Sequence, residues 1–113
     1  MGKLIHKDNI ILSDMKIVRS ILNLFIGLRL SNHKKINNGM CFIMSHENRY
    51  PVDMWFCFYS YDILFIDSNL KVVDKISLQP WKSYLPRKRF KYIIESKLNR
   101  FKEIKMGDKI KII

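Results

Sequence analysis

The chain has 113 residues, 48% of them hydrophobic and 12% aromatic, which is the size and composition of one folded domain. These values exclude a disordered tail and an assembly of several domains. The 21 Lys and Arg outnumber the 10 Asp and Glu and give a formal net charge of +11. Such a charge favours anionic partners such as nucleic acid, anionic lipid or an acidic protein. Most of the excess lies in residues 82–113.

The first expected elements are a hairpin and a helix. Residues 3–12 place apolar side chains on both sides of a turn-like Lys-Asp-Asn segment, which predicts a short hairpin. After it, apolar side chains recur every three or four residues. Ser13 is suited to begin a helix and Gly27 to end one. This spacing predicts one amphipathic helix over about residues 14–26.

From residue 40 onwards, short runs rich in Ile, Val, Phe, Tyr and Trp alternate with turn residues, as is typical of an antiparallel β domain. Strands are expected near residues 40–46, 52–58, 61–67, 71–78, 89–95 and 109–113. The predicted fold is therefore mainly β, and α+β by content. We expect a compact antiparallel β-sandwich or barrel with one N-terminal amphipathic helix, forming a single domain over residues 1–113.

The loop at residues 47–51 aligns the strands on either side of it as a hairpin. A five-residue loop would place Cys41 opposite Cys57, where two reduced thiols would pack among Met, Phe and Trp side chains. The sequence has neither a C-x-x-C motif nor a zinc-ligand spacing. From the residues present we also expect neither a secretory leader nor an apolar run long enough to span a membrane. These features favour a cytoplasmic location.

A second hairpin is expected around Ser68-Asn69. A two-residue turn there would place Asp62 opposite Lys75. Because Asp62 lies between aromatic and aliphatic residues, we expect it to be partly buried and paired with that lysine. Asp74, by contrast, is expected at a solvent-exposed position of its strand.

Six segments in chain order carry a family resemblance: GMCFIM, PVDMWFCFYSYDILFID, KVVDKI, QPWKSYLP, YIIE and MGDKIKI. Together they resemble the prokaryotic family known as domain of unknown function 192 over about residues 13–113. The best part of the match runs from the apolar strand before Asp62 through Trp81 and Pro86 to Glu95 and finally Gly107-Asp108. In FIGLRLS, Ile26 and Arg29 replace an Arg and a Met of the family pattern. The resemblance implies a compact, mainly antiparallel β domain with one packed helix, and it carries no activity over to this chain.

An enzyme would need a pocket around a perturbed titratable group, and Asp62 is the carboxylate that we most expect to be buried. In that case a concave pocket should contain it together with Trp81, Lys82 or Glu95. The candidate pocket residues are therefore Asp62, Lys75, Trp81, Lys82 and Glu95. The alternative is that Asp62 is paired for structural reasons alone.

The sequence contains no residue spacing that is typical of a metal site or a cofactor site. His6, His33, His46 and the two cysteines form no known ligand spacing, so no metal site is expected. The 4 glycines are spread along the chain and form no phosphate-binding loop. We therefore expect no cofactor, and no catalytic residue is assigned.

The candidate anion or nucleic-acid surface is the densest basic stretch, which contains Arg87, Lys88, Arg89 and Lys91. Such cations neutralise phosphates, and an exposed Trp81 or Tyr84 beside them would stack on bases. The alternative is that these charges only solvate the protein.

Three functions remain open. A small ligand- or partner-binding β domain is favoured, and it predicts an exposed apolar groove at one mouth of the sandwich. The alternatives are a basic-surface binder of single-stranded nucleic acid and an enzyme with a pocket around Asp62, although the sequence leans against an enzyme. It indicates neither the partner nor the oligomeric state.

Overall fold

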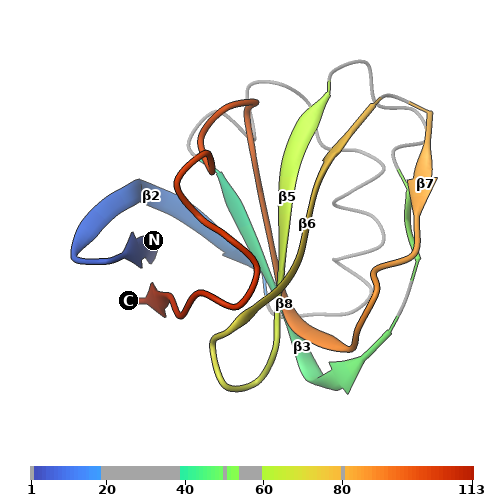
Figure 1. Cartoon of the computed structure of the whole chain (residues 1–113), viewed down its shortest axis with the longest axis horizontal. Coiled ribbons are helices and arrows are strands. Elements are labelled where there is room, and N and C mark those ends of the chain that lie inside the picture. Colours follow the sequence, from blue (N-terminus) through green and yellow to red (C-terminus); the bar gives the residue numbers. More distant parts are fainter. Residues whose placement is uncertain (1, 19–38, 50, 54–59, 80) are drawn as a thin grey trace.

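The computed structural model describes residues 2–18, 39–49, 51–53, 60–79 and 81–113 (Figure 1). They form the strands β1 (Gly2–His6), β2 (Asn9–Val18), β3 (Met40–Asn48), β4 (Val52–Asp53), β5 (Tyr61–Ile66), β6 (Val72–Leu78), β7 (Ser83–Tyr84), β8 (Phe90–Ser96) and β9 (Lys111–Ile112). One 7-stranded sheet has the order β6-β5-β8-β3-β2-β1-β9, and β4 pairs with β7 in a 2-stranded sheet. Neighbouring strands are antiparallel except for the parallel pair β2–β3. The prediction of a mainly β fold is confirmed.

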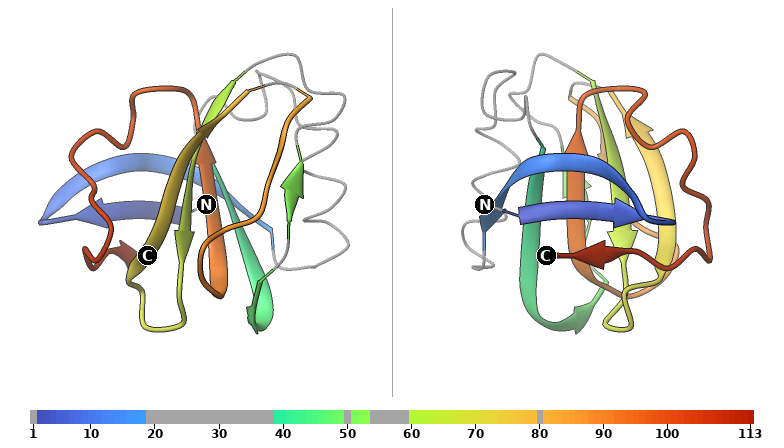
Figure 2. Two further views of the ribbon diagram at one scale, coloured as in Figure 1. Left: turned by 45° about the vertical axis from the view of Figure 1, so that its right-hand side comes forward. Right: turned by 90° about the vertical axis from the view of Figure 1, so that its left-hand side faces the viewer.

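The large sheet curls until its two edge strands approach each other, as the views in Figure 2 show. β6 and the segment leading into β9 are joined by backbone hydrogen bonds, among them one of 2.9 Å from Val72 N to Asp108 O. Beside it, an isolated antiparallel bridge pairs Lys71 with Lys109. The result is a half-barrel with a concave face, a convex face and a seam between β6 and β9.

Each face of the curled sheet is covered by its own apolar cluster. The concave cluster contains Leu4, Leu12, Met15, Cys41, Leu64, Ile66, Val72, Ile94, Phe101, Ile104 and Ile110. The convex cluster contains Met40, Phe42, Met44, Val52, Tyr61, Ile63, Phe65, Leu78, Phe90 and Ile93. Because β5 lies between β6 and β8 and is covered on both faces, every residue of its sequence YDILFI is buried.

The helix predicted over residues 14–26 is corrected: its first residues continue strand β2, and the others lie outside the described residues. Within β2, Leu12 and Met15 are both buried although they are three positions apart. The cause is a β-bulge, because Met15 pairs with Gly2 and Leu12 with Leu4, so that three steps along β2 oppose two along β1. A bulge of this kind gives buried residues a spacing that imitates a helix.

The predicted opposition of Cys41 and Cys57 is wrong. Cys41 lies in the sheet between Ile17 of β2 and Ile94 of β8. A strand residue has only two lateral neighbours, so no further strand pairs with it there. Cys57 itself lies outside the described residues. The short loop suggested a local hairpin, whereas β3 is a central strand whose partners are distant in sequence.

The hairpin of β5 and β6 is confirmed, but its predicted register is wrong. Asp62 opposes Ser77 and not Lys75. The turn is longer than two residues, because a hydrogen bond of 3.0 Å from Asp67 N to Lys71 O closes it. A bulge near the turn then adds a further residue on β6. The two effects together move the partner of Asp62 by two residues, from Lys75 to Ser77.

Within the ranges that the structure describes, no helix is long and apolar enough to cross a membrane.

Candidate functional site

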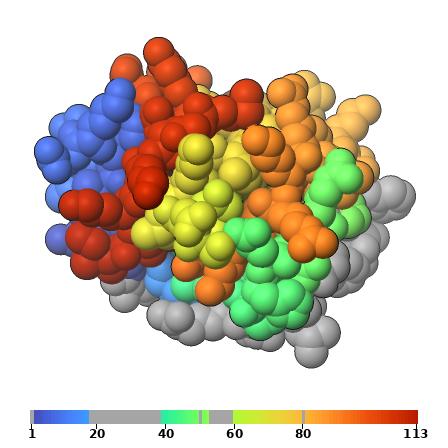
Figure 3. Space-filling view, turned by 60° about the horizontal axis from the view of Figure 1, so that its bottom comes forward, coloured from blue at the N-terminus to red at the C-terminus, as the bar shows by residue number. Residues whose placement is uncertain are grey.

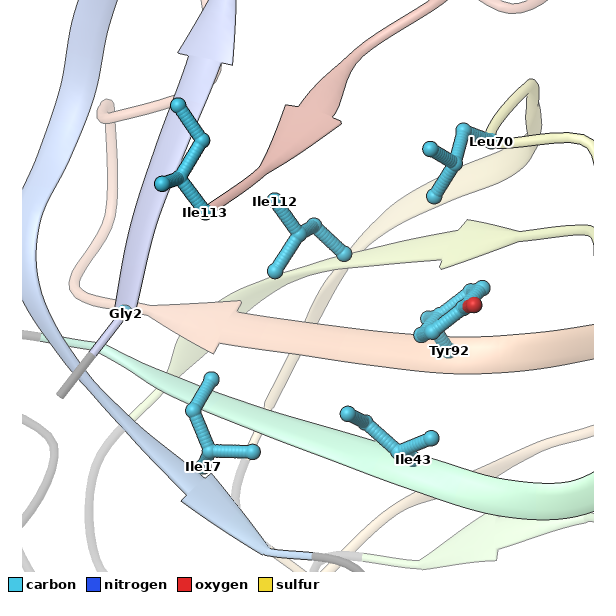
Figure 4. Close-up of a pocket in the computed structure, with 7 residues that line it drawn as sticks. All are labelled: Gly2, Ile17, Ile43, Leu70, Tyr92, Ile112 and Ile113. Atoms are coloured by element: carbon cyan, nitrogen blue, oxygen red, sulfur yellow. The ribbon is translucent and has the colours of Figure 1, made fainter.

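The concave core opens at one end into a pocket of about 390 Å³ (Figure 4). Its lining consists of Gly2, Ile17, Ile43, Leu70, Tyr92, Ile112 and Ile113. Tyr92 and Ile43 oppose each other on β8 and β3, so backbone pairing presents both side chains to the same space. Apart from the Tyr92 hydroxyl, every lining side chain is apolar. The apolar side chains make up the larger part of the wall and polar backbone atoms the rest, so the pocket suits an apolar group with a few polar contacts.

The corner of this pocket depends on a glycine. A Cβ added to Gly2 would lie 2.7 Å from Cδ1 of Ile17 and 3.3 Å from the carbonyl oxygen of Ile113. Because glycine has no side chain, these two residues can approach the start of β1 closely. Lys3 and Ile113 exchange backbone hydrogen bonds of 2.9 and 3.0 Å, which hold the end of β9 in place.

The other end of the concave core is closed by the segment of residues 97–110 between β8 and β9, here called the closing segment. In Figure 1 it passes from the upper end of β8 to the C-terminal strand. Phe101 and Ile104 project from it into the concave cluster, and both are 0% exposed. The core thus has one closed end and one open end.

Asp62 is one anchor of the closing segment. Its carboxylate accepts a hydrogen bond from Oγ of Ser77 and another, of 2.6 Å, from the backbone N–H of Asn99. The residue is 7% exposed, so these donors replace the water that its burial removes. The carboxylate therefore fixes the turn that follows β8.

Lys75 is a second anchor. Its Nζ donates to the carbonyl oxygens of Phe101 at 2.5 Å and of Ile104 at 2.8 Å. An ammonium group shared by two carbonyls makes strong charge-assisted hydrogen bonds. Asp62 and Lys75, which the sequence predicted to bind each other, instead hold two different parts of one segment.

A third anchor joins the closing segment to β1. Oδ2 of Asp108 accepts hydrogen bonds from Nε2 of His6 at 2.8 Å and from the N–H of Lys105 at 3.0 Å. These two bonds, that of Lys105 first, lower the pKa of the Asp108 carboxyl from its ordinary value of 3.8. Because the pKa is lowered, the ionised form and its bonds persist at neutral pH and are lost only as the pH falls through the lowered value.

The remaining candidate pocket residues lie apart from these anchors. Trp81 is 47% exposed in the turn before β7, where its φ of 64° is rare for a bulky residue, and Lys82 beside it is exposed. Glu95 is fully buried on β8 between Met40 and Ile63, on the sheet face opposite to the Asp62 and Lys75 anchors. The described contacts do not bring the five residues together, and a shared catalytic pocket stays a prediction.

Asp74 is buried, and the expectation that it faces solvent is wrong. It is 1% exposed, and its Oδ2 accepts hydrogen bonds from the hydroxyl of Tyr84 at 2.5 Å and from the N–H of Arg87 at 2.9 Å. Oδ1 accepts from the N–H of Lys75 at 2.8 Å. Burial and then the bond to Asp74 raise the pKa of Tyr84. Asp74 thus holds β7 and the chain after it onto β6.

The predicted basic stretch runs along the surface from the segment between β7 and β8 into the start of β8. Arg87, Lys88 and Arg89 are exposed and Lys91 is half-buried. Figure 3 shows the face on which the end of β3, in green, adjoins this stretch, in orange.

Sequence reasoning missed a fifth cation of this basic surface. Nε of Arg49 donates a hydrogen bond of 2.6 Å to the carbonyl oxygen of Pro86, which brings the end of β3 to the stretch. The pKa of Glu47 is lowered, mainly by hydrogen bonds from Ser68 and also by the charges of Arg89 and Lys91. Arg49 lies close to the basic stretch because β3 pairs with β8, and the sequence does not reveal this pairing. We call the five cations Arg49, Arg87, Lys88, Arg89 and Lys91 the basic surface.

The sequence matches the domain of unknown function 192 family, described as "Uncharacterized ACR", over residues 4–112. The chain belongs to this family. The resemblance read from the motifs is therefore confirmed. A UPF0127 protein of Pyrococcus horikoshii is 36% identical over an alignment of 102 residues that covers 87% of this chain and 86% of the relative. A UPF0127 protein of Pyrococcus abyssi is 35% identical over an alignment of 80 residues that covers 67% of this chain and 68% of the relative.

Two solved structures share the fold of this member of the domain of unknown function 192 family. A Sinorhizobium meliloti protein, provisionally named a transcription regulator, matches with a TM-score of 0.80 at 18% identity, over 97% of this chain and 90% of its own. A Novosphingobium aromaticivorans protein of unknown function matches with a TM-score of 0.80 at 15% identity, over 97% of this chain and 82% of its own. At these identities the likeness concerns the fold alone.

Proposed function

We propose that this chain is a binding module that takes a small, predominantly apolar ligand into the pocket at the open end of the concave core. The observation that carries the proposal is the pocket itself, of about 390 Å³ and lined by side chains of Ile, Leu and Tyr. Ligand sites in proteins are typically preformed, mostly apolar cavities of about 300–1,000 Å³ with a few polar groups. This pocket has those properties.

The arrangement of the core supports the proposal further. Anchored at three points, the closing segment fills the far end of the core with Phe101 and Ile104. A ligand that enters from the open end meets the lined pocket, where each Å² of apolar surface it buries is worth about 25 cal/mol. The Tyr92 hydroxyl supplies one hydrogen-bonding group at the wall.

The test is a titration with Nile red, an uncharged apolar dye. We expect saturable fluorescence enhancement with the native chain and a loss of affinity of about tenfold or more in Ile43→Trp, because an indole would occupy the pocket. Ile10→Trp is the matched control, since Ile10 is 56% exposed on the β1–β2 hairpin and outside the lining. Equal binding by the native chain and Ile43→Trp would contradict the proposal, provided that both unfold at similar temperatures.

The second candidate function is binding of single-stranded nucleic acid by the basic surface. The observation that favours it is Arg49, which the fold adds to the predicted stretch through its bond to Pro86. Five cations on one surface would neutralise phosphates and release counterions. Trp81 lies before β7 and the basic stretch after it, and the hydroxyl of Tyr84 is bound to Asp74. Stacking of bases on these two rings is therefore not part of this candidate function.

This candidate predicts a strong salt dependence of binding to labelled oligothymidine, measured by fluorescence anisotropy. Replacing Arg87, Lys88 and Arg89 by glutamine should reduce the slope of log affinity against log salt by about 2, since each phosphate contact contributes about 0.7 for single strands. Replacing the exposed Arg100, Lys102 and Lys105 instead removes the same net charge and should have little effect. Absent or salt-independent binding would end this candidate.

A further inference from the structure

We propose that the ligand of the pocket is amphipathic: an apolar tail inside the pocket and an anionic head, carboxylate or phosphate, held outside it by a row of lysines. This inference rests on the proposed binding function and adds the chemical class of the ligand.

The row consists of Lys3, Lys71, Lys109 and Lys111, all of them exposed. It follows the seam of the half-barrel, because Lys71 opposes Lys109 in the bridge between β6 and β9, and Lys111 lies two residues further along the same strand face. Lys3 continues the row on β1, where its backbone pairs with Ile113. Four positive charges thus lie on three neighbouring strands.

The row borders the pocket. Lys3, Lys71 and Lys111 are the immediate chain neighbours of Gly2, Leu70 and Ile112, which are lining residues. In Figure 4, Ile113, Ile112 and Leu70 lie along one side of the pocket. Adjacent strand residues point to opposite faces, so Lys3 and Lys111 project from the outer face of the sheet while Gly2 and Ile112 line the pocket. A lysine side chain is long and flexible, so its ammonium group can bend round the edge of the sheet to a head group at this rim.

Carboxylates do not neutralise the row within the part of the chain that the structure describes. The ion pair found there joins His6 to Asp108 and includes none of the four lysines. Asp67, which is close to Lys71, uses Oδ1 to accept the backbone N–H groups of Asn69 and Lys71 at 2.9 and 3.0 Å. Asp14, an exposed carboxylate on β2, lies across from Lys3 and opposes one of the four charges. The rim therefore has a positive excess.

The pairing of Lys71 with Lys109 is an additional indication. Like charges directly opposite each other in a sheet repel and lower stability. An anion between them would convert this repulsion into two attractive contacts. The apolar lining next to them selects the tail, and the lysine row selects the head, so an ion without a tail would lack most of the contacts.

The test is displacement of Nile red by four ligands that share one tail: decanoate, decyl phosphate, decanol and decyltrimethylammonium. We expect both anions to displace the dye at concentrations about tenfold lower than decanol, and the cation to be no better than decanol. Replacing Lys71 and Lys111 by glutamine should abolish the preference for anions and leave the affinities for Nile red and decanol unchanged. A difference between decanoate and decyl phosphate identifies which head group fits better.

The matched control replaces Lys88 and Lys102, both exposed and outside the row, by glutamine and should retain the preference. Equal displacement by decanoate and decanol would overturn the inference and leave the binding function standing. A preference that survives in the Lys71 and Lys111 variant would overturn the role of the lysine row. If Nile red does not bind and no ligand has an effect, the proposed function fails, and this inference fails with it.

Discussion

Replacing Phe101 by alanine is expected to lower the free energy of unfolding by about 3–5 kcal/mol, the usual cost of removing a buried phenyl ring. Phe101 is 0% exposed and belongs to the concave cluster at its closed end. Its carbonyl oxygen also accepts the hydrogen bond from Lys75, so the ring and the anchor act on the same turn. Urea unfolding followed by circular dichroism would measure the loss.

The matched control is Leu98→Ala in the same segment, because Leu98 is 46% exposed. We expect it to change stability by less than about 0.5 kcal/mol. If Phe101→Ala were as mild as this control, the closing segment would not close the core. Nile red binding at the open end should persist in the control.

Replacing Asp74 by alanine is expected to lower the free energy of unfolding by about 3 kcal/mol. Its carboxylate is 1% exposed and accepts three hydrogen bonds, from the backbone N–H groups of Lys75 and Arg87 and from the hydroxyl of Tyr84. Without it, donors that the fold has removed from water lose their acceptor. Tyr84→Phe removes only one of these donors and should cost about 1 kcal/mol. Urea unfolding gives both values.

A variant that carries both Asp74→Ala and Tyr84→Phe separates the interaction between these two side chains from their other effects on stability. If Asp74 and Tyr84 interact as the structure places them, their combined effect should be smaller than the sum of the single effects by at least about 0.5 kcal/mol. Strictly additive effects would show that the two side chains act independently. The comparison requires that both single variants retain the native circular dichroism spectrum.

Sequence patterns predicted the β-rich part of the fold because short apolar runs between turn residues depend on local chemistry. The same local reasoning predicted a helix from residue 14 on the spacing of Met15 and the apolar residues after it, whereas residues 14–18 continue strand β2. It also predicted a register in which Asp62 opposes Lys75. That register depended on the length of one turn and on a bulge beside it, and composition alone defines neither.

The candidate site was harder to predict, because its parts meet only through the sheet order. Asp62 was expected to be buried, and it is, but its partner Asn99 lies in a different segment. None of the seven lining residues of the pocket was a candidate, since isolated isoleucines carry no signal until β2, β3, β8 and β9 enclose the same space. His6 and Asp108 likewise come from opposite ends of the chain.

The pairing of β1 with β9 sets the order in which the molecule can be assembled. Leu4 opposes Ile112, so this contact forms only when residues far apart in the sequence come together. Closing such a long loop costs conformational entropy, and contacts of this kind slow folding. During synthesis, β1 would wait for its partner until residues 111–112 of β9 have been made. Ile112 is also part of the pocket wall, so the pocket is complete only after β9 has paired with β1. The wall of the pocket therefore depends on a contact that forms late in folding.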